Sequence, residues 1–363
     1  MSTVPPSARD PLVTVIVPTH DHAGTIDLAL DSVLAQTVTD IEVVVIGDGA
    51  TDEVRDALDR YPADPRLRTV LRPKSASRAE GVRHEVLTSA RSTFVGYHGD
   101  DDLMLPDHLE YLLELLEDAD FANPFPMAIA PDGSAFWHGT DLALPECRDW
   151  HQHPQRNSVS LTGVVHRLSA YRRLPLGWQP APPGRWSDHV MWQQWFATPG
   201  LTYRTGARPT TLKLDTSYRR GMTPEERRTE LLSWRDRAAQ PGFGSELASL
   251  AADAVRRFGT RNLMESARFA DEAARLAEVA EAIPALQADI AQLRGELSAL
   301  AGERDTLRVE RDVLRGELSA LAGERDTLRV ERDAMAATKT WRLHDRVTRS
   351  APARALLRSA RRS

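Results

Sequence analysis

Cysteine is almost absent from this sequence. Cys147 is the single cysteine among 363 residues, so the chain can form no disulfide bond with itself, and nothing in it indicates an oxidising compartment. Residues 1–11 lack the charged and apolar regions of a secretory signal peptide. No apolar run reaches the roughly 18 residues that a membrane-spanning helix needs. We therefore expect a cytoplasmic protein, soluble or attached peripherally to the inner face of the cell membrane.

Charge is distributed unevenly along the chain. The whole sequence carries a formal net charge of −6, whereas residues 334–363 contain eight Lys or Arg and one Asp, a net of +7. The preceding residues therefore carry −13. An acidic body argues against nucleic acid as a partner, and the basic C-terminal segment is free to meet an anionic surface.

Strand and helix patterns alternate in the first third of the chain. Short β-branched runs indicate buried strands, and the segments between them carry apolar residues at helical spacing. This alternation predicts an α/β domain with a mainly parallel sheet flanked by helices. We expect strands at 13–17, 41–46, 67–71 and 94–97, and helices at 25–36, 52–61, 78–91 and 186–196.

Candidate ligand-binding residues follow three of the expected strands, at Pro18-Thr19-His20, at Asp48 and at the triplet Asp100-Asp101-Asp102. Ligands of such sheets bind at the carboxyl ends of the strands, so we expect these residues to converge. Three adjacent carboxylates repel one another, and a divalent cation would offset their charge. The triplet is also compatible with a solvated acidic loop or with the start of the helix that follows Pro106.

The C-terminal part of the chain is repetitive. Residues 293–312 recur identically at 314–333, a shift of 21 residues or three heptads. Apolar side chains recur at one heptad position, which is typical of a coiled coil. A coiled coil has a second core position in each heptad, and arginine occupies half of these sites here. The sequence therefore leaves open how many helices associate and in which orientation. The alternative is a single charged helix in solvent. The repeated apolar position comprises Leu286, Leu293, Leu300, Leu307, Leu314, Leu321, Leu328 and Met335.

These patterns divide the chain into four parts. We expect an α/β domain over 1–221 and a helical extension over 222–284, with a break at Pro241-Gly242. A coiled coil over 285–335 and a basic amphipathic tail over 336–363 follow.

Several motifs resemble those of the family 2 glycosyltransferases, whose catalytic domain has the GT-A (Rossmann-like) fold. Pro18-Thr19-His20-Asp21 resembles the family's Pro-Thr-Tyr-Asn turn, and Gly47-Asp48-Gly49 resembles its Asp-Asp-Gly segment. Gly99-Asp100-Asp101-Asp102 resembles its Asp-x-Asp-Asp metal motif. Including similar segments at 31–37 and 83–90, the resemblance extends over residues 13–214. It implies a nucleotide-sugar donor, a UDP-sugar being favoured, and Mn²⁺ or Mg²⁺ as cofactor.

The resemblance also assigns roles to single residues. It places Asp48 at the donor base, His20 where an aromatic ring packs on that base, and Pro18 in the same turn. It places Arg78 at the nucleotide, and the Arg fork suits phosphate. It makes Asp101 the metal ligand, with Asp100 near the ribose or the water shell of the metal.

Inverting transfer needs a base that takes the proton of the acceptor hydroxyl. In the family this base is an Asp in a Glu-Asp-like pair before a helix, and Asp188 is the best match in position and context. The alternative is that Asp188 only caps its helix.

The sequence departs from the family pattern at Gly47, Gly99 and Ser187, where acidic residues are usual. These departures leave a rival function open, a catalytically weak nucleotide-binding scaffold that acts through its coiled coil. A nucleotidyltransferase is a second rival, but it would carry a Gly-rich basic loop after the first strand.

The resemblance also extends to the partners. The tail is similar to basic tails that follow coiled coils in some bacterial cell-envelope glycosyltransferases. This implies a glycan, lipid-linked or protein acceptor in cell-envelope or surface polysaccharide assembly. A homo-oligomer would form through the coiled coil, with peripheral membrane contact through the tail. A solvated, disordered tail is the alternative.

Six tryptophans occur between residues 137 and 195, where an acceptor site is expected. Aromatic faces line sugar sites, but packing in the core is the commoner role of a tryptophan.

Overall fold

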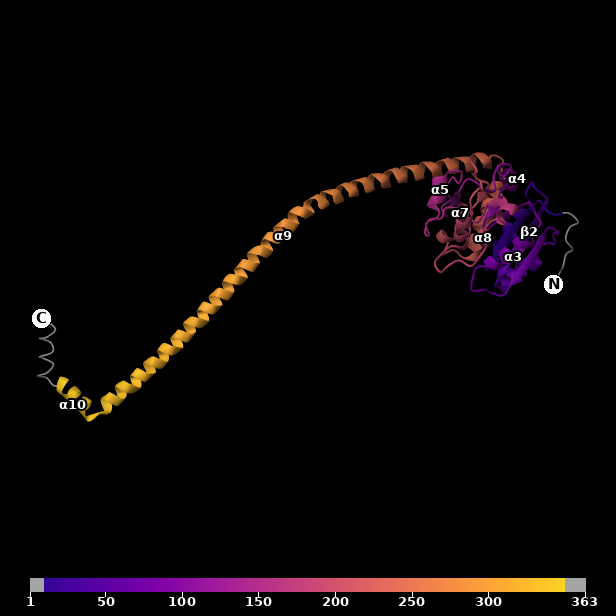
Figure 1. Ribbon diagram of the computed structural model, residues 1–363. Helices are drawn as coiled ribbons and strands as arrows, with labels where there is room; N and C mark the ends of the chain where they lie inside the picture. The colour runs from indigo at the N-terminus through magenta and orange to yellow at the C-terminus, as the bar shows by residue number, and fades with distance from the viewer. Residues whose placement is uncertain (1–9, 350–363) are drawn as a thin grey trace. The chain divides into compact units, whose positions relative to one another are not determined.

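The chain divides between Ala267 and Arg268 into two units, in a computed structural model that describes residues 10–349 (Figure 1). Within these described residues, the N-terminal unit holds eleven strands, and the C-terminal unit is formed by the rest of a long helix and one short helix. The strands are β1 (Val13–Thr19), β2 (Ile41–Asp48), β3 (Leu67–Arg72), β4 (Phe94–Tyr97), β5 (Leu103–Met104), β6 (Phe121–Asn123), β7 (Met127–Ile129), β8 (Ala135–Trp137), β9 (Val165–Arg167), β10 (Tyr203–Thr205) and β11 (Thr211–Leu212). The helices are α1 (Ile26–Leu34), α2 (Asp52–Arg60), α3 (Glu80–Ser89), α4 (His108–Leu115), α5 (Pro145–Trp150), α6 (Leu168–Tyr171), α7 (Ser187–Ala197), the 3₁₀ helix η1 (Thr216–Tyr218), α8 (Pro224–Ala238), α9 (Phe243–Ala337) and α10 (Lys339–Thr348).

The central sheet has seven strands in the order β10-β6-β9-β4-β1-β2-β3. β1 pairs in parallel with β2 and β4, and β2 pairs in parallel with β3. β9 is the reversed strand, antiparallel to both β4 and β6. The predicted α/β class with a mainly parallel sheet flanked by helices is therefore confirmed, and the four strands expected from the sequence form its parallel half.

Both faces of the sheet are covered, which explains why its strands read as continuous apolar runs. Alternate residues of β1 enter different cores: Ile16 packs on one side with Tyr97, Phe121 and Trp192. Val15 packs on the other side with residues of α1 and α4. The functional residues that follow these strands are thus held by backbone that is buried on both sides.

Helix α8 is held against the rest of the N-terminal unit by ion pairs as well as by apolar packing. Its first turn is closed by a capping box between Thr223 and Glu226. Arg219 is fully buried and donates to both carboxylate oxygens of Glu230, at 2.7 and 2.5 Å. Two buried side chains of α8, Leu231 and Trp234, complete the contact. Helix α8 ends at Ala238 and α9 begins at Phe243, so the helical run is interrupted around Gly242, whose φ is 91°, as the sequence predicted.

Helix α9 begins in the N-terminal unit, where Phe243, Leu247 and Ala254 are buried. It continues without interruption through Pro284, so the expected extension and coiled coil share one helix. In the C-terminal unit the repeated leucines are exposed, Leu307 by 64% and Leu314 by 58%. Of the expected basic tail, α10 is described and residues 350–363 lie outside the described residues. Among residues 10–349, no helix has an apolar stretch long enough to cross a membrane.

The Arg219–Glu230 pair gives a test of how α8 is held. Glu230→Ala leaves the Arg219 guanidinium buried without its carboxylate, so we expect a loss of about 3 kcal/mol in the free energy of unfolding of the N-terminal unit. Denaturant unfolding followed by tryptophan fluorescence measures it. The control Glu225→Ala, at an exposed position of the same helix, should change the value by less than about 0.5 kcal/mol. Equal losses in the two variants would contradict this role of the pair.

Candidate active site

A cavity of about 670 Å³ lies at the carboxyl ends of β1, β2 and β4. The first turn of α7 and the segment after β11 complete its wall. All of the residues predicted for the site line this one cavity, although they come from positions up to 170 residues apart. They are Pro18, His20, Asp48, Arg78, Asp100, Asp101 and Asp188.

Asp48 ends β2 and is held by basic and hydroxyl partners. Its Oδ2 accepts from Lys74 Nζ at 2.5 Å and from Ser75 Oγ at 3.0 Å, and its Oδ1 accepts from the Ser75 backbone N–H at 2.7 Å. Burial alone would raise its pKa, but these donors outweigh burial and hold the pKa of Asp48 below its usual value. Asp48 is therefore a fixed, ionised acceptor in the cavity.

The acidic triplet after β4 meets three basic side chains. His22 Nδ1 lies 2.8 Å from Asp100 Oδ1. Asp101 pairs with Arg227, and the Lys213 ammonium lies 3.2 Å from Asp102. The sequence did not point to any of these three partners.

Asp102 has a structural role. It is fully buried and accepts from Thr162 Oγ1 at 2.5 Å and from the Leu214 backbone N–H at 2.7 Å. These contacts join the end of β4 to the segment after β11, so Asp102 holds this part of the cavity wall together.

Asp100, Asp101 and His22 are close enough to share a metal ion, since one ligand atom from each lies within 4.8 Å of the others. Two adjacent carboxylates suit Mn²⁺ or Mg²⁺. His22 is held differently: its hydrogen bond to Asp100 and the charge of that carboxylate outweigh burial and raise its pKa to about 9. The two aspartates therefore fit a divalent metal, and His22 meets Asp100 through Nδ1 beside them.

Asp188 lies in the first turn of α7 and faces the cavity. Residue Trp186 occupies the N-cap position, and no side chain caps this helix. The Asp188 carboxylate accepts from the adjacent His189 N–H at 2.8 Å. Burial raises the pKa of Asp188, and this bond and the nearby Arg83 offset only part of the effect. A carboxylate with a raised pKa at a cavity wall has the properties of a general base.

Two arginines differ sharply in their surroundings. Arg78 is exposed at the cavity mouth. Arg83 is buried, its guanidinium lies 4.1 Å from the ring centre of Trp178, and its Nε has no hydrogen-bond partner. Burial lowers the pKa of Arg83. Both cations line the cavity, so it carries positive charge opposite the acidic triplet.

Four of the six tryptophans lie in the main core or at the cavity, whereas Trp137 packs partly buried in another cluster and Trp150 is 43% exposed elsewhere. Trp178, Trp192 and Trp195 are buried in the core. Trp186 is 50% exposed and lines the cavity beside Asp188. Packing thus explains three of them, and one aromatic face is available to a ligand.

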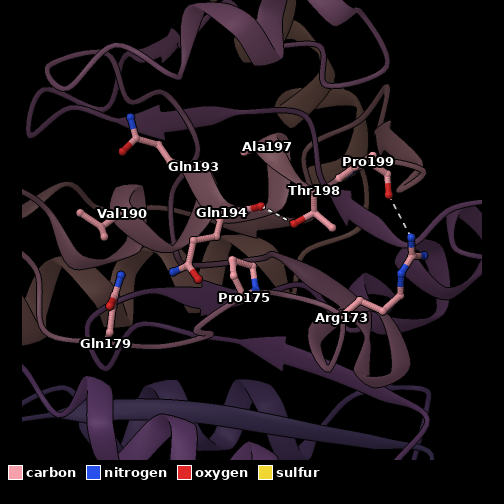
Figure 2. Close-up of a pocket in the computed structure, with 9 residues that line it drawn as sticks. All are labelled: Arg173, Pro175, Gln179, Val190, Gln193, Gln194, Ala197, Thr198 and Pro199. Carbon is pink, nitrogen blue, oxygen red and sulfur yellow. Dashed lines mark hydrogen bonds between the residues drawn. The ribbon is translucent and has the colours of Figure 1, made fainter.

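Helix α7 also borders a second hollow, of about 540 Å³ (Figure 2). One face of the helix, with Val190, Gln193, Gln194 and Ala197, lies opposite Arg173 and Pro175. Arg173 donates to the Pro199 carbonyl at 2.9 Å. None of the described residues that line this hollow is a carboxylate or an imidazole, so it offers neither a base nor a metal ligand.

Residues 14–175 match the family described as Glycosyl transferase family 2. This part of the chain belongs to that family. The seven-stranded sheet and its helices accordingly form a GT-A domain, as the motifs implied.

Two curated relatives of this family 2 domain have names that indicate a pathway. The chondroitin synthase of Pasteurella multocida (strain Pm70) is 33% identical over 135 residues, which cover 36% of this chain and 14% of the relative. The putative teichuronic acid biosynthesis glycosyltransferase TuaG of Bacillus subtilis (strain 168) is 31% identical over 116 residues, 32% of this chain and 46% of the relative. The chain thus spans less than half of the length of either relative.

Similar solved structures include S. aureus TarS 1-349 in complex with UDP-GlcNAc. It is 16% identical, with a TM-score of 0.47, and the match covers 68% of this chain and 72% of that one.

The two glycines that depart from the family 2 pattern lie close to neighbouring side chains. A Cβ at Gly99 would lie 2.8 Å from Asp102 Oδ2 and 2.9 Å from Thr162 Oγ1. A Cβ at Gly47 would lie 2.6 Å from Leu71 Cδ2. A larger residue at Gly99 would displace two hydrogen-bonded groups, whereas at Gly47 it would displace the end of one leucine side chain.

The His22–Asp100 contact predicts a pH dependence of stability. Since the pKa of His22 rises from 6.5 to about 9 on folding, its contribution is fully present below pH 6.5 and is lost as pH rises through about 9. We expect the free energy of unfolding of the N-terminal unit to fall over this range, and His22→Gln to flatten the profile. Denaturant titrations at several pH values measure it, and an unchanged profile in the variant would contradict the assignment.

Proposed function

We propose that this protein is an inverting glycosyltransferase that moves a sugar from a nucleotide-sugar donor, a UDP-sugar, to an acceptor hydroxyl. The observation that supports this proposal is that every residue assigned from the family 2 motifs lines one cavity. The names of the relatives, a chondroitin synthase and a teichuronic acid biosynthesis enzyme, favour a role in cell-envelope or surface polysaccharide assembly. A glycan acceptor, free or lipid-linked, fits that role better than a protein.

The cavity supports a direct displacement. Asp48 accepts from the ring N–H of the base, with His20 beside that ring, and Arg78 meets the phosphates. Asp188 takes the proton of the acceptor hydroxyl. The oxygen of that hydroxyl then bonds to the anomeric carbon, while the bond between this carbon and the diphosphate breaks. A divalent metal, held by Asp101 and Asp100, supplies charge that stabilises the leaving diphosphate when it is bound. Trp186 gives the acceptor ring an apolar surface next to the base.

Two conservative variants separate the base from the metal ligand. Asp188→Asn removes the proton acceptor but keeps the shape of the side chain, so we expect transfer to fall by about 10²–10⁴-fold with nucleotide binding unchanged. Asp101→Asn should abolish transfer and also weaken binding of UDP in the presence of Mn²⁺. Donor turnover assays and calorimetry measure the two effects.

The matched control is Asp59→Asn, an exposed aspartate of α2 outside the cavity, which should keep full activity. Full activity in Asp101→Asn and Asp188→Asn would refute the assigned roles. Normal UDP binding in the wild type without transfer or slow donor hydrolysis would favour the scaffold function instead.

We further propose that the C-terminal unit assembles copies of the chain through its heptad seam. The seam leucines from Leu286 to Leu328 are all exposed in the single chain, and a second helix would bury them. The seam arginines pair with the following residue, as Arg304 does with Asp305 at 2.7 Å and Arg311 with Asp312 at 2.7 Å. These pairs lower the cost of placing Arg beside a partner helix.

A seam variant tests this assembly. Leu307→Glu combined with Leu314→Glu places charge at two core positions of the seam, so we expect the mass in solution to fall to that of one chain. Light scattering on the full chain measures the mass. Val309→Glu is the matched control, because Val309 is 65% exposed and lies off the seam. An equal mass for wild type and seam variant would refute the role of the seam.

Membrane contact is the remaining part of the proposal. Helix α10 places Arg342 and Arg346 one turn apart, with Leu343 and Val347 beside them. This pattern supports an interfacial helix on anionic lipid. The cytoplasmic location stays a prediction.

A further inference from the structure

The metal-binding position contains an arginine from outside the matched family region. Arg227 of α8 pairs with Asp101, and its second nitrogen lies 3.1 Å from His22 Nε2. Both partners of the pair are largely buried, with side-chain exposures of 13% and 7%. Thr216 Oγ1 also donates to Asp101 Oδ2 at 2.9 Å. The Oδ2 atom of Asp101, one of its two possible metal-ligating oxygens, is therefore already engaged twice.

The backbone that carries Arg227 is fixed. The adjacent Arg228 donates to both carboxylate oxygens of Asp27, at 2.7 and 2.8 Å. On the same helix, Glu230 pairs with the buried Arg219. Helix α8 therefore stays docked, and the Arg227 side chain can change partner by rotating about its own bonds.

Charge favours such a change of partner. Asp101 and Asp102 each pair with a resident cation, Arg227 and Lys213 respectively. A divalent cation that joins them in a buried place adds two positive charges beside the Arg227 guanidinium, which is unfavourable unless Arg227 leaves Asp101. The diphosphate of a donor would bring the negative charge that compensates the metal.

We propose that Arg227 is the resident counter-ion of Asp101, that it gives way when metal and nucleotide bind together, and that its guanidinium then binds the diphosphate. This inference rests on the proposed function, which supplies the nucleotide diphosphate. The planar fork of Arg pairs with carboxylate and with phosphate in the same way, so one side chain serves both states. Arg227 thereby provides the counter-charge of Asp101 before the donor binds and couples metal binding to donor binding.

The test is a titration of the full chain with Mn²⁺ in the absence of nucleotide. Electron paramagnetic resonance measures the Mn²⁺ that stays free. We expect Arg227→Gln to bind Mn²⁺ at least about tenfold more tightly than wild type, because Asp101 has lost its competing cation. We also expect UDP to tighten Mn²⁺ binding by about 5- to 150-fold in wild type, and by much less in Arg227→Gln. Arg227→Lys keeps the charge without the fork and should lie between them. Arg227→Lys also serves as the test variant if Arg227→Gln proves less stable than wild type.

Two further variants locate the effect. Arg235→Gln changes an exposed arginine of the same helix that pairs with Asp236, and it should bind Mn²⁺ as wild type does. Adding Asp101→Asn to Arg227→Gln should remove the gain in Mn²⁺ affinity.

Three results would overturn the proposal: no gain in Mn²⁺ affinity in either Arg227 variant, a gain that persists without Asp101, or no detectable Mn²⁺ binding in any variant. Failure of the proposed function looks different, since sugar transfer would then be absent while the Mn²⁺ and UDP titrations still follow the expected order.

Discussion

Three carboxylates in succession at the end of a buried strand must be neutralised, and much of the N-terminal unit is arranged to do so. Lys213, directly after β11, and Arg227 of α8 reach the triplet from beyond the residues that match the family. His22 comes from the turn after β1. The segment after residue 175 is therefore part of the site, because without it two buried carboxylates would lack a counter-charge.

The same constraint explains the tight packing around the triplet. Asp102 accepts from Thr162 and from the Leu214 N–H, and a Cβ at Gly99 would lie 2.8 Å from Asp102 and 2.9 Å from Thr162. Asp102 is thus a structural link between the end of β4 and the segment after β11. All three carboxylates line the cavity, but only Asp102 is bonded to two elements of the fold in this way.

The heptad unit follows a different logic. Its helix has exposed leucines on one seam and arginine–aspartate pairs along the other positions. Little of its surface is buried within one chain, so the tertiary packing that stabilises the N-terminal unit does not act on it. A helix of this kind gains stability mainly when a partner helix covers the seam. Catalysis and assembly are therefore proposed for separate units, each with its own source of stability.

The sequence by itself determined the four parallel strands of the first hundred residues and the residues at their carboxyl ends, because period, β-branching and Pro or Gly stops are local signals. The strand order and the short later strands came only from the tertiary structure. The sequence therefore predicted the α/β fold and placed Asp48, Asp101 and Asp188 as candidates that later proved to share a cavity. Only the tertiary structure decided which cations meet the triplet. Arg227 lies 126 residues from Asp101, and nothing local distinguishes it from the adjacent Arg228, which pairs with Asp27 instead. The choice depends on how α8 docks, and docking is set by packing and by the buried Arg219–Glu230 pair.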